Sequence, residues 1–217
     1  GSATVICSDK TGTLTRNEMT VTRIVCTDGS FSITGSGYEP IGAVTDESQM
    51  TVTLDDSPAL GELVKAGVLC NDARLRHQEG QWRIDGDPTE GALLVLAGKV
   101  DLDPDEVVGH WPRTDAIPFE SELQYMATLH HDHTGHALIY LKGSPEAVLS
   151  RCDHAWQSDD PLDVEQWRET AENMAAEGLR VLAVAEKRWD AHKTVLELDD
   201  TQHGLVLLGL VGMTDPP

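Results

Sequence analysis

The sequence has few positive charges, few aromatic rings and no long hydrophobic run. Its 217 residues include 16 Lys and Arg against 37 Asp and Glu, a formal net charge of −21, and aromatic residues make up 5 %. Nucleic acids and anionic lipid surfaces require clustered cations, so the composition argues against both as partners. The longest apolar run, Leu205–Val211, is far shorter than the ~20 residues of a membrane-spanning helix. The four cysteines (Cys7, Cys26, Cys70 and Cys152) form no CxxC pair, which indicates reduced thiols in a cytosolic compartment.

What is present is the composition of a globular domain, with 40 % hydrophobic and 24 % charged residues. Alternating apolar residues predict strands over 18–27, 30–35, 123–131, 136–142, 179–187 and 205–213, a short strand over 49–54, and a polar hairpin over 74–84. A capping residue followed by proline predicts helices that begin after Ser57, Asp87, Asp103 and Ser144, and a long helix is expected over 160–177. The fold class predicted is α+β, a twisted and mostly antiparallel sheet flanked by helices.

The first chemically informative residue is Asp9, which follows the apolar run Ala3–Cys7. A carboxylate is a competent nucleophile toward phosphorus, and it then forms an acyl phosphate. The chemistry also needs a cation, and a turn whose backbone N–H groups face the phosphoryl oxygens. The residues Lys10–Thr13 can supply this turn. Taken alone, Asp9 is better explained as a turn former.

The longer string favours the catalytic interpretation. Ile6–Thr15, followed by Asn17–Thr20, resembles the phosphorylation loop of P-type cation-transporting ATPases. The resemblance implies that Asp9 is the aspartate phosphorylated by ATP, and that Mg²⁺ is shared by the Asp9 carboxylate and the Thr11 backbone carbonyl. The related haloacid-dehalogenase-like phosphatases carry a second Asp at the position of Thr11, so the threonine favours a persistent phosphoenzyme and the ATPase over the phosphatase.

The resemblance continues along most of the chain, in family order. It is carried by Gly86–Leu93, Ile117–Phe119 with Tyr125 and Met126, Lys142–Glu146, Gly178–Ala183 and Asp215–Pro217. Together these segments are similar to the type II branch, which includes Ca²⁺ and Na⁺/K⁺ pumps. The family implies an ATP-binding cytoplasmic domain of an integral membrane protein that presents the γ-phosphate to Asp9.

The resemblance also implies a division of the chain. Residues 1–16 would comprise a Gly-Ser cloning remnant and the first strand and phosphorylation loop of the phosphorylation domain. Residues 17–212 would form the nucleotide-binding domain, and 213–217 the hinge back to the phosphorylation domain. The TGD-type and GDGxND-type sequences that complete the family's Mg²⁺ and phosphoryl site do not occur. We therefore expect the isolated chain to bind nucleotide without turnover; its partners would be ATP and the phosphorylation domain, actuator domain and transmembrane helices of the same parent.

Seven residues are predicted to surround the nucleotide: Glu90, Phe119, Met126, Lys142, Gly143, Arg180 and Leu182. The Phe119 ring can stack on a purine, although a core phenylalanine is the more common case. The Lys142 ammonium is expected beside the helix N-terminus at Ser144, where a phosphate or an adenine nitrogen would bind; the alternative is a solvated lysine at a strand end. Glu90 can accept a hydrogen bond from the adenine amino group, or it simply favours the helix dipole.

Two positions depart from the family pattern. Ser121 and Gln124 stand where relatives commonly carry an arginine and a lysine, so positive charge near the triphosphate is lost. We therefore predict weak ATP binding. The alternative function is a non-catalytic acidic interaction module that has lost ATP binding, and a free-standing phosphatase is a third.

Histidines crowd the predicted hairpin at 130–136. Imidazoles at this spacing can bind Zn²⁺, Ni²⁺ or Cu²⁺. Because strand alternation points neighbouring rings to opposite faces, a polar hairpin tip is the favoured interpretation.

Overall fold

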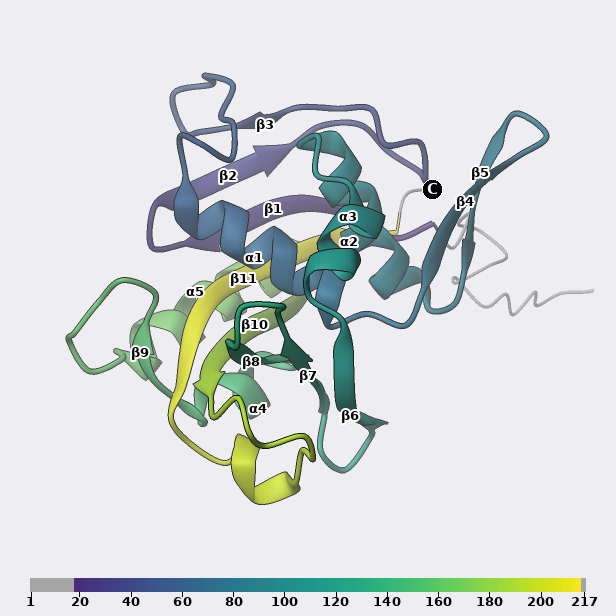
Figure 1. The fold of residues 1–217 in the computed structure, drawn as a ribbon. Coiled ribbons are helices and arrows are strands. Elements are labelled where there is room, and N and C mark those ends of the chain that lie inside the picture. The colour runs from purple at the N-terminus through teal and green to yellow at the C-terminus, as the bar shows by residue number, and fades with distance from the viewer. Residues whose placement is uncertain (1–17, 216–217) are drawn as a thin grey trace, which may run out of the picture.

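The protein is built around one long, mostly antiparallel sheet, seen in a computed structural model that describes residues 18–215 (Figure 1). Its strands are β1 (Thr20–Cys26), β2 (Gly29–Ile33), β3 (Val44–Thr45), β6 (Arg113–Glu120), β7 (Tyr125–His131), β8 (Ala137–Gly143), β9 (Cys152–Ala155), β10 (Arg180–Trp189) and β11 (Leu205–Thr214). They follow the order β3-β2-β1-β11-β10-β8-β7-β6, and β9 pairs with β11 in parallel. The hairpin of β4 (Arg74–Gln78) and β5 (Gln81–Asp85) is a separate two-stranded sheet that projects from the molecule (Figure 1). The predicted fold class is confirmed.

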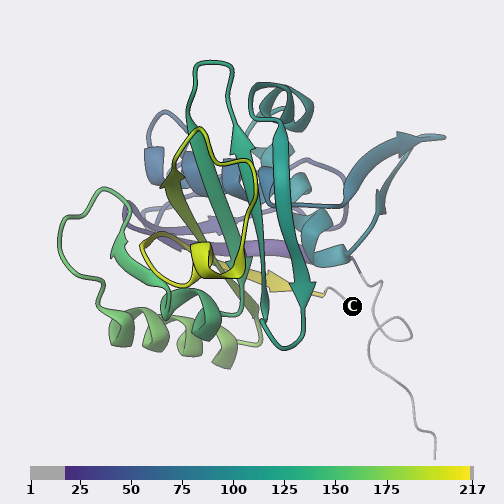
Figure 2. The same cartoon turned by 60° about the horizontal axis from the view of Figure 1, so that its bottom comes forward.

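Helices cover both faces of the sheet (Figures 1 and 2). The helices are α1 (Pro58–Leu69), α2 (Pro88–Lys99), α3 (Pro104–His110), α4 (Pro145–Leu149) and α5 (Val164–Ala176), with a short 3-10 turn at Leu198–Thr201. Successive strand residues enter opposite cores: Tyr140 packs with α1 and α2, whereas Ile139 and Leu141 pack with α4 and α5. This alternation is what a strand buried on both faces requires. None of the described helices is long and apolar enough to span a bilayer.

Four of the helices begin where capping chemistry predicts. The side chain of Ser57 accepts a hydrogen bond from the Leu60 N–H at 3.3 Å. The side chain of Asp87 accepts one from the Thr89 N–H at 2.8 Å, and the side chain of Ser144 accepts one from the Ala147 N–H at 3.2 Å. Asp103 caps α3 in the same way. Each cap is followed by a proline, whose missing N–H costs nothing at this position. The four predicted helix starts depend only on residues close by in the sequence, and the structure confirms them.

Several elements differ from the prediction, including the short strands β3 and β9, which were not predicted. Strand β6 is not among the predicted strands; it contains Pro118 and forms at the sheet edge, where a missing donor is tolerated. The helix expected over 160–177 begins at Val164, since Asp163 caps it. The strand expected over 49–54 is wrong: Gln49 has a positive φ, and only Thr51 forms an isolated bridge.

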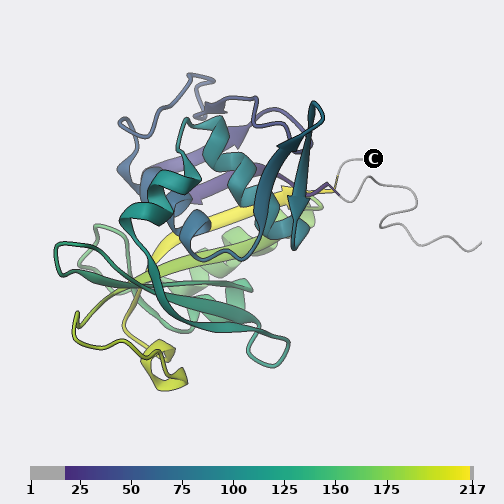
Figure 3. The same cartoon turned by 45° about the vertical axis from the view of Figure 1, so that its right-hand side comes forward.

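The two ends of the described part lie side by side. Thr20 at the start of β1 is paired with Thr214 at the end of β11. Both strands are central in the sheet, and their paired ends lie at one side of the molecule (Figure 3). Asp9 and Thr11, the predicted nucleophile and Mg²⁺ ligands, lie outside the described residues.

Candidate functional site

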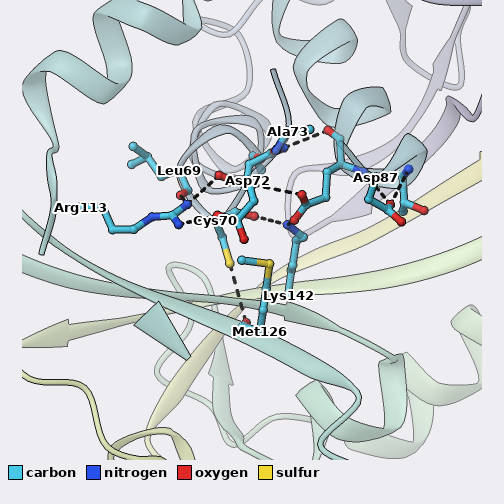
Figure 4. Close-up of polar contacts among 12 residues, drawn as sticks. Leu69, Cys70, Asp72, Ala73, Asp87, Arg113, Met126 and Lys142 are labelled. Carbon is cyan, nitrogen blue, oxygen red and sulfur yellow. Dashed lines mark hydrogen bonds and ion pairs between the residues drawn. The ribbon is translucent and has the colours of Figure 1, made fainter. Parts of the chain in front are cut away.

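The candidate site is organised around an ion pair between Lys142 on β8 and Glu90 on α2. Lys142 Nζ lies 2.6 Å from Glu90 Oε1, and it also donates to the backbone carbonyl of Cys70 (Figure 4). The two side chains are only 7 % and 12 % exposed. Separating a pair that is shielded from water to this degree would leave a buried charge without its partner, which is energetically costly. The two side chains are therefore held firmly together.

The surrounding elements fix both members of the pair. Lys142 lies between Met126 on β7 and Val184 on β10 in the register of the sheet. Glu90 stands in the first turn of α2, which Asp87 caps, and its Oε2 accepts from the Asp72 N–H at 3.1 Å. A carboxylate has about four acceptor positions. One more donor, such as an amino group of a ligand, can therefore still be accommodated.

The position of Lys142 corrects both of its interpretations from sequence. It is buried, so it is not a solvated lysine at a strand end. Its ammonium does not bond at the N-terminus of α4 but at the C-terminal end of α1, where Cys70 is the cap. The cause is the strand period: α4 packs on the other face of the sheet from the one that the Lys142 neighbours Met126 and Val184 occupy.

Phe119 lies near the end of β6 and is 60 % exposed. The pairing of β6 with β7 is irregular here, between Ile117 and Glu120. The structure thus excludes the core explanation for this ring, in contrast to Phe31, which is buried at 4 % exposure. A large ring left in solvent at a strand end is available as a stacking surface.

The remaining predicted residues fall into two groups. Met126 is buried beneath Lys142, and Gly143 follows it; a Cβ at Gly143 would lie 2.3 Å from the Gln124 carbonyl oxygen, so only glycine lets the backbone approach this closely. Arg180 and Leu182 begin β10, and Ala183 is paired with Gly143. Arg180 is exposed.

The structure therefore brings Glu90, Met126, Lys142 and Gly143 together. Leu182 precedes the residue that is paired with Gly143, so it lies close by. No hydrogen bond or ion pair among residues 18–215 joins Phe119 or Arg180 to the Lys142–Glu90 pair. A groove of about 1000 Å³ opens between β4 and helices α2 and α3; Asn71, Asp72 and Arg113 are among its lining residues, but none of the seven predicted residues lines it.

Sequence reasoning missed three residues that hold the site in place: Asn71, Asp72 and Arg113. They connect the end of α1 to Glu90 and to β6. The available signal was the end of α1, whose last turn contains no basic residue. Carbonyls at a helix C-terminus need donors from somewhere, and here they come from other elements.

Among the described residues, neither the cysteines nor the histidines add chemistry to the candidate site. Cys26, Cys70 and Cys152 are free and buried. Burial raises the pKa of the Cys70 thiol, whose Sγ lies 3.7 Å from the Met126 carbonyl oxygen, so it is not a thiolate nucleophile.

In the hairpin, His130 is buried and donates from Nδ1 to the Trp111 carbonyl at 2.9 Å, whereas His136 pairs with Asp132 near the tip. No group of three or more potential metal-ligating side chains forms in the part of the chain that the structure describes.

The fold and the site together define an α+β domain whose sheet buries a lysine–glutamate pair under two capped helices. Residues 59–217 match the family model for the P-type ATPase cytoplasmic domain N. The chain belongs to this family.

Several curated proteins match over the whole chain. It is 46 % identical to Cation-transporting ATPase pma1 of Synechocystis sp., 37 % to Calcium-transporting ATPase type 2C member 1 of Bos taurus and 32 % to the Calcium-transporting ATPase of Bacillus subtilis. In each case 100 % of this chain is covered but only 24 %, 22 % and 25 % of the relative. The chain thus spans about a quarter of the length of these relatives.

Proposed function

We propose that this chain binds ATP as the nucleotide domain of a cation-transporting P-type ATPase and presents the γ-phosphate to Asp9 in the intact pump. The observation that carries the proposal is the exposed ring of Phe119, which the sheet leaves in solvent although Phe31 is buried. A purine stacked on an aromatic ring gains about 1–3 kcal/mol. The names of the relatives, which are cation-transporting and calcium-transporting ATPases, support the same function.

In this proposal the base and the phosphates are bound by different residues. The adenine lies against Phe119, with Leu182 and Gly143 beside it and the Glu90 carboxylate as acceptor for the amino group. Lys142 holds the Glu90 carboxylate in this orientation through the contact at 2.6 Å. Arg180, which forms no ion pair with another described residue, is the cation available to the phosphates.

The proposed domain division places 17–212 in the nucleotide-binding domain, and 1–16 and 213–217 in the phosphorylation domain. The pairing of Thr20 with Thr214 supports it, because both connections then leave through adjacent strands.

Mg²⁺ would accompany ATP and be held by the Asp9 carboxylate and the Thr11 carbonyl, neither of which is among the described residues. Bound there, it would offset the negative charge that builds up on the transferring phosphoryl group. We propose that the isolated chain binds nucleotide without turnover, because no TGD-type or GDGxND-type sequence is present.

One observation favours the second candidate, an acidic interaction module. The Lys142 ammonium is already bonded to a carboxylate and a carbonyl. Ser121 and Gln124 contribute no charge near the proposed triphosphate. Phosphate binding would therefore rest mainly on Arg180, which makes weak affinity the expectation for the first candidate and loss of affinity the expectation for the second.

Equilibrium titration with ATP separates the two candidates. We expect saturable, weak binding to the wild-type chain and a loss of affinity of about tenfold in Phe119→Ala, as the stacking energy implies. Met50→Ala is the matched control, because Met50 is 66 % exposed in the turn after β3, at the opposite edge of the sheet from β6, and its truncation also removes exposed apolar surface. No response of the wild-type chain at millimolar ATP would favour the interaction module.

A further inference from the structure

The C-terminal end of α1 is held by two cations that come from different strands of the sheet. The last carbonyls of a helix lack partners within the helix and carry its negative dipole end. Arg113 Nη2 on β6 donates to the Asn71 carbonyl at 2.6 Å and to the Leu69 carbonyl at 3.3 Å. Lys142 donates to the carbonyl of Cys70, between them. Figure 4 shows Arg113 and Lys142 approaching this segment from opposite sides.

The same segment also positions Glu90. The Asp72 N–H donates to Glu90 Oε2 at 3.1 Å, and the Asn71 side chain donates to the Glu90 backbone carbonyl at 2.9 Å. A second bond from Asn71 Nδ2, to the Gly67 carbonyl at 2.9 Å, ties this contact back to α1. A shift of the segment would therefore move the acceptor of Lys142 and a donor to Glu90 together.

Arg113 also belongs to the strand that carries Phe119. Strand β6 is at the edge of the sheet, and among the described strands it pairs only with β7. Its register with β7 is irregular at both ends, after Arg113 and after Ile117. The bonds from Arg113 thus anchor an edge strand directly to the helix layer.

We propose that Arg113 is a positioning residue for the nucleotide site, which acts by fixing the segment Leu69–Asp72 between the Lys142–Glu90 pair and the strand of Phe119. This inference rests on the proposed ATP binding. Arg113 is not among the seven residues predicted to surround the nucleotide, and it acts through backbone carbonyls on a segment that itself bonds to Glu90 and Lys142.

The carbonyl bonds, and not the ion pair, carry this role. Arg113 Nη1 lies 2.5 Å from Asp72 Oδ1, but the Asp72 side chain is 59 % exposed, so solvent screens the attraction. The bonds to the Leu69 and Asn71 carbonyls are partly buried. A planar guanidinium can reach two carbonyls at once, which the single ammonium of a lysine cannot do with the same geometry.

The test is the ATP affinity of Arg113→Met, which keeps the apolar stem and removes the donors. We expect affinity to fall about fivefold, the effect of losing charge-assisted hydrogen bonds that act indirectly, and the Asp72 amide proton resonance to shift upfield as its bond to Glu90 weakens. Arg168→Met on α5 is the matched control: it removes an exposed pair with Glu165 and should change neither quantity. Arg113→Lys is expected to show a smaller loss of the same kind, and it replaces Arg113→Met if that variant does not fold.

A double-mutant cycle distinguishes positioning from general destabilisation. In a Glu90→Gln background, Arg113→Met should cost less than about twofold in affinity, since the group it positions is already lost. Equal losses in both backgrounds, or a wild-type affinity in Arg113→Met with an unmoved Asp72 amide, would overturn the positioning role while ATP binding stood. Absence of ATP binding by the wild-type chain would instead overturn the proposed function, and the positioning role with it.

Discussion

Lys142 and Glu90 lie 52 positions apart in the sequence, yet their charged atoms meet at 2.6 Å beneath α1 and α2. The pair joins the sheet to the helix layer at the point where α1 ends. Because both side chains are almost fully buried, the pair is a structural element of the domain, and in the proposed function it also orients the acceptor for the adenine amino group.

The first prediction concerns stability. Glu90→Gln leaves the buried Lys142 ammonium without a counter-charge, so we expect the free energy of unfolding to fall by about 3 kcal/mol. Urea unfolding followed by circular dichroism measures the change. Glu165→Gln, which breaks the exposed pair with Arg168, is the control and should cost less than about 0.5 kcal/mol. Equal effects of the two substitutions would show that the Lys142–Glu90 pair is not buried as described.

The second prediction concerns the missing positive charge. Gln124 is exposed in the turn between β6 and β7, close to Gly143. Gln124→Lys should raise ATP affinity by about fivefold at low salt, with the gain shrinking as ionic strength rises. Gln166→Lys on α5 adds the same charge at an exposed site away from β6–β8 and should change affinity little. A similar gain from both variants would mean that net charge alone governs binding.

The third prediction concerns Glu186, a partly buried carboxyl on β10. Burial, and next the charge of Glu62, raise the pKa of Glu186 to about 7 from 4.5, although Lys65 and Arg188 oppose the shift. The folded state thus holds this proton more tightly than the unfolded state, so Glu186 contributes stability that is present below pH 4.5 and is lost as the pH rises through 7. Over this window Glu186→Gln should gain stability relative to wild type by on the order of 2 kcal/mol. Glu172→Gln, an exposed control on α5, should show no such trend.

The fourth prediction concerns His130, for which the pH dependence of stability has the opposite sign. Burial lowers the pKa of His130 to about 4 from 6.5, and the ring donates from Nδ1 to the Trp111 carbonyl. The unfolded state therefore takes up a proton that the folded state refuses, and stability falls as the pH drops from 6.5 toward 4. The difference between wild type and His130→Gln should change over this window by roughly 2 kcal/mol. A difference that is independent of pH would show that His130 titrates normally in the folded state.

The helices illustrate what the sequence could predict. Ser57, Asp87 and Ser144 each precede a proline, and the physics of capping acts within four residues, so the start of each helix could be inferred without any knowledge of the fold. Strand β6 could not, because Pro118 is compatible with a strand only at an edge. Whether a strand lies at an edge is decided by the whole sheet.

For the candidate site, the sequence could predict residues but not the contacts between them. The resemblance to the P-type ATPases identified Glu90 and Lys142, but their bond to each other and the carbonyl of Cys70 depend on how α1, α2 and β8 pack. Arg113 escaped prediction for the same reason: its partners are backbone atoms far away in the sequence. The proposed roles of Asp9 and Thr11 stay predictions, since these residues lie outside the described part of the chain.

Backbone amide chemical shifts during an ATP titration test the central claim most directly, with tripolyphosphate as the comparison ligand. The account predicts that ATP changes the amide chemical shifts of Phe119, Gly143 and Leu182. Tripolyphosphate, which has no base to stack, should leave the amide chemical shift of Phe119 unchanged. Shifts confined to the groove between β4 and α3, near Trp82, or no shifts at millimolar ATP, would contradict it.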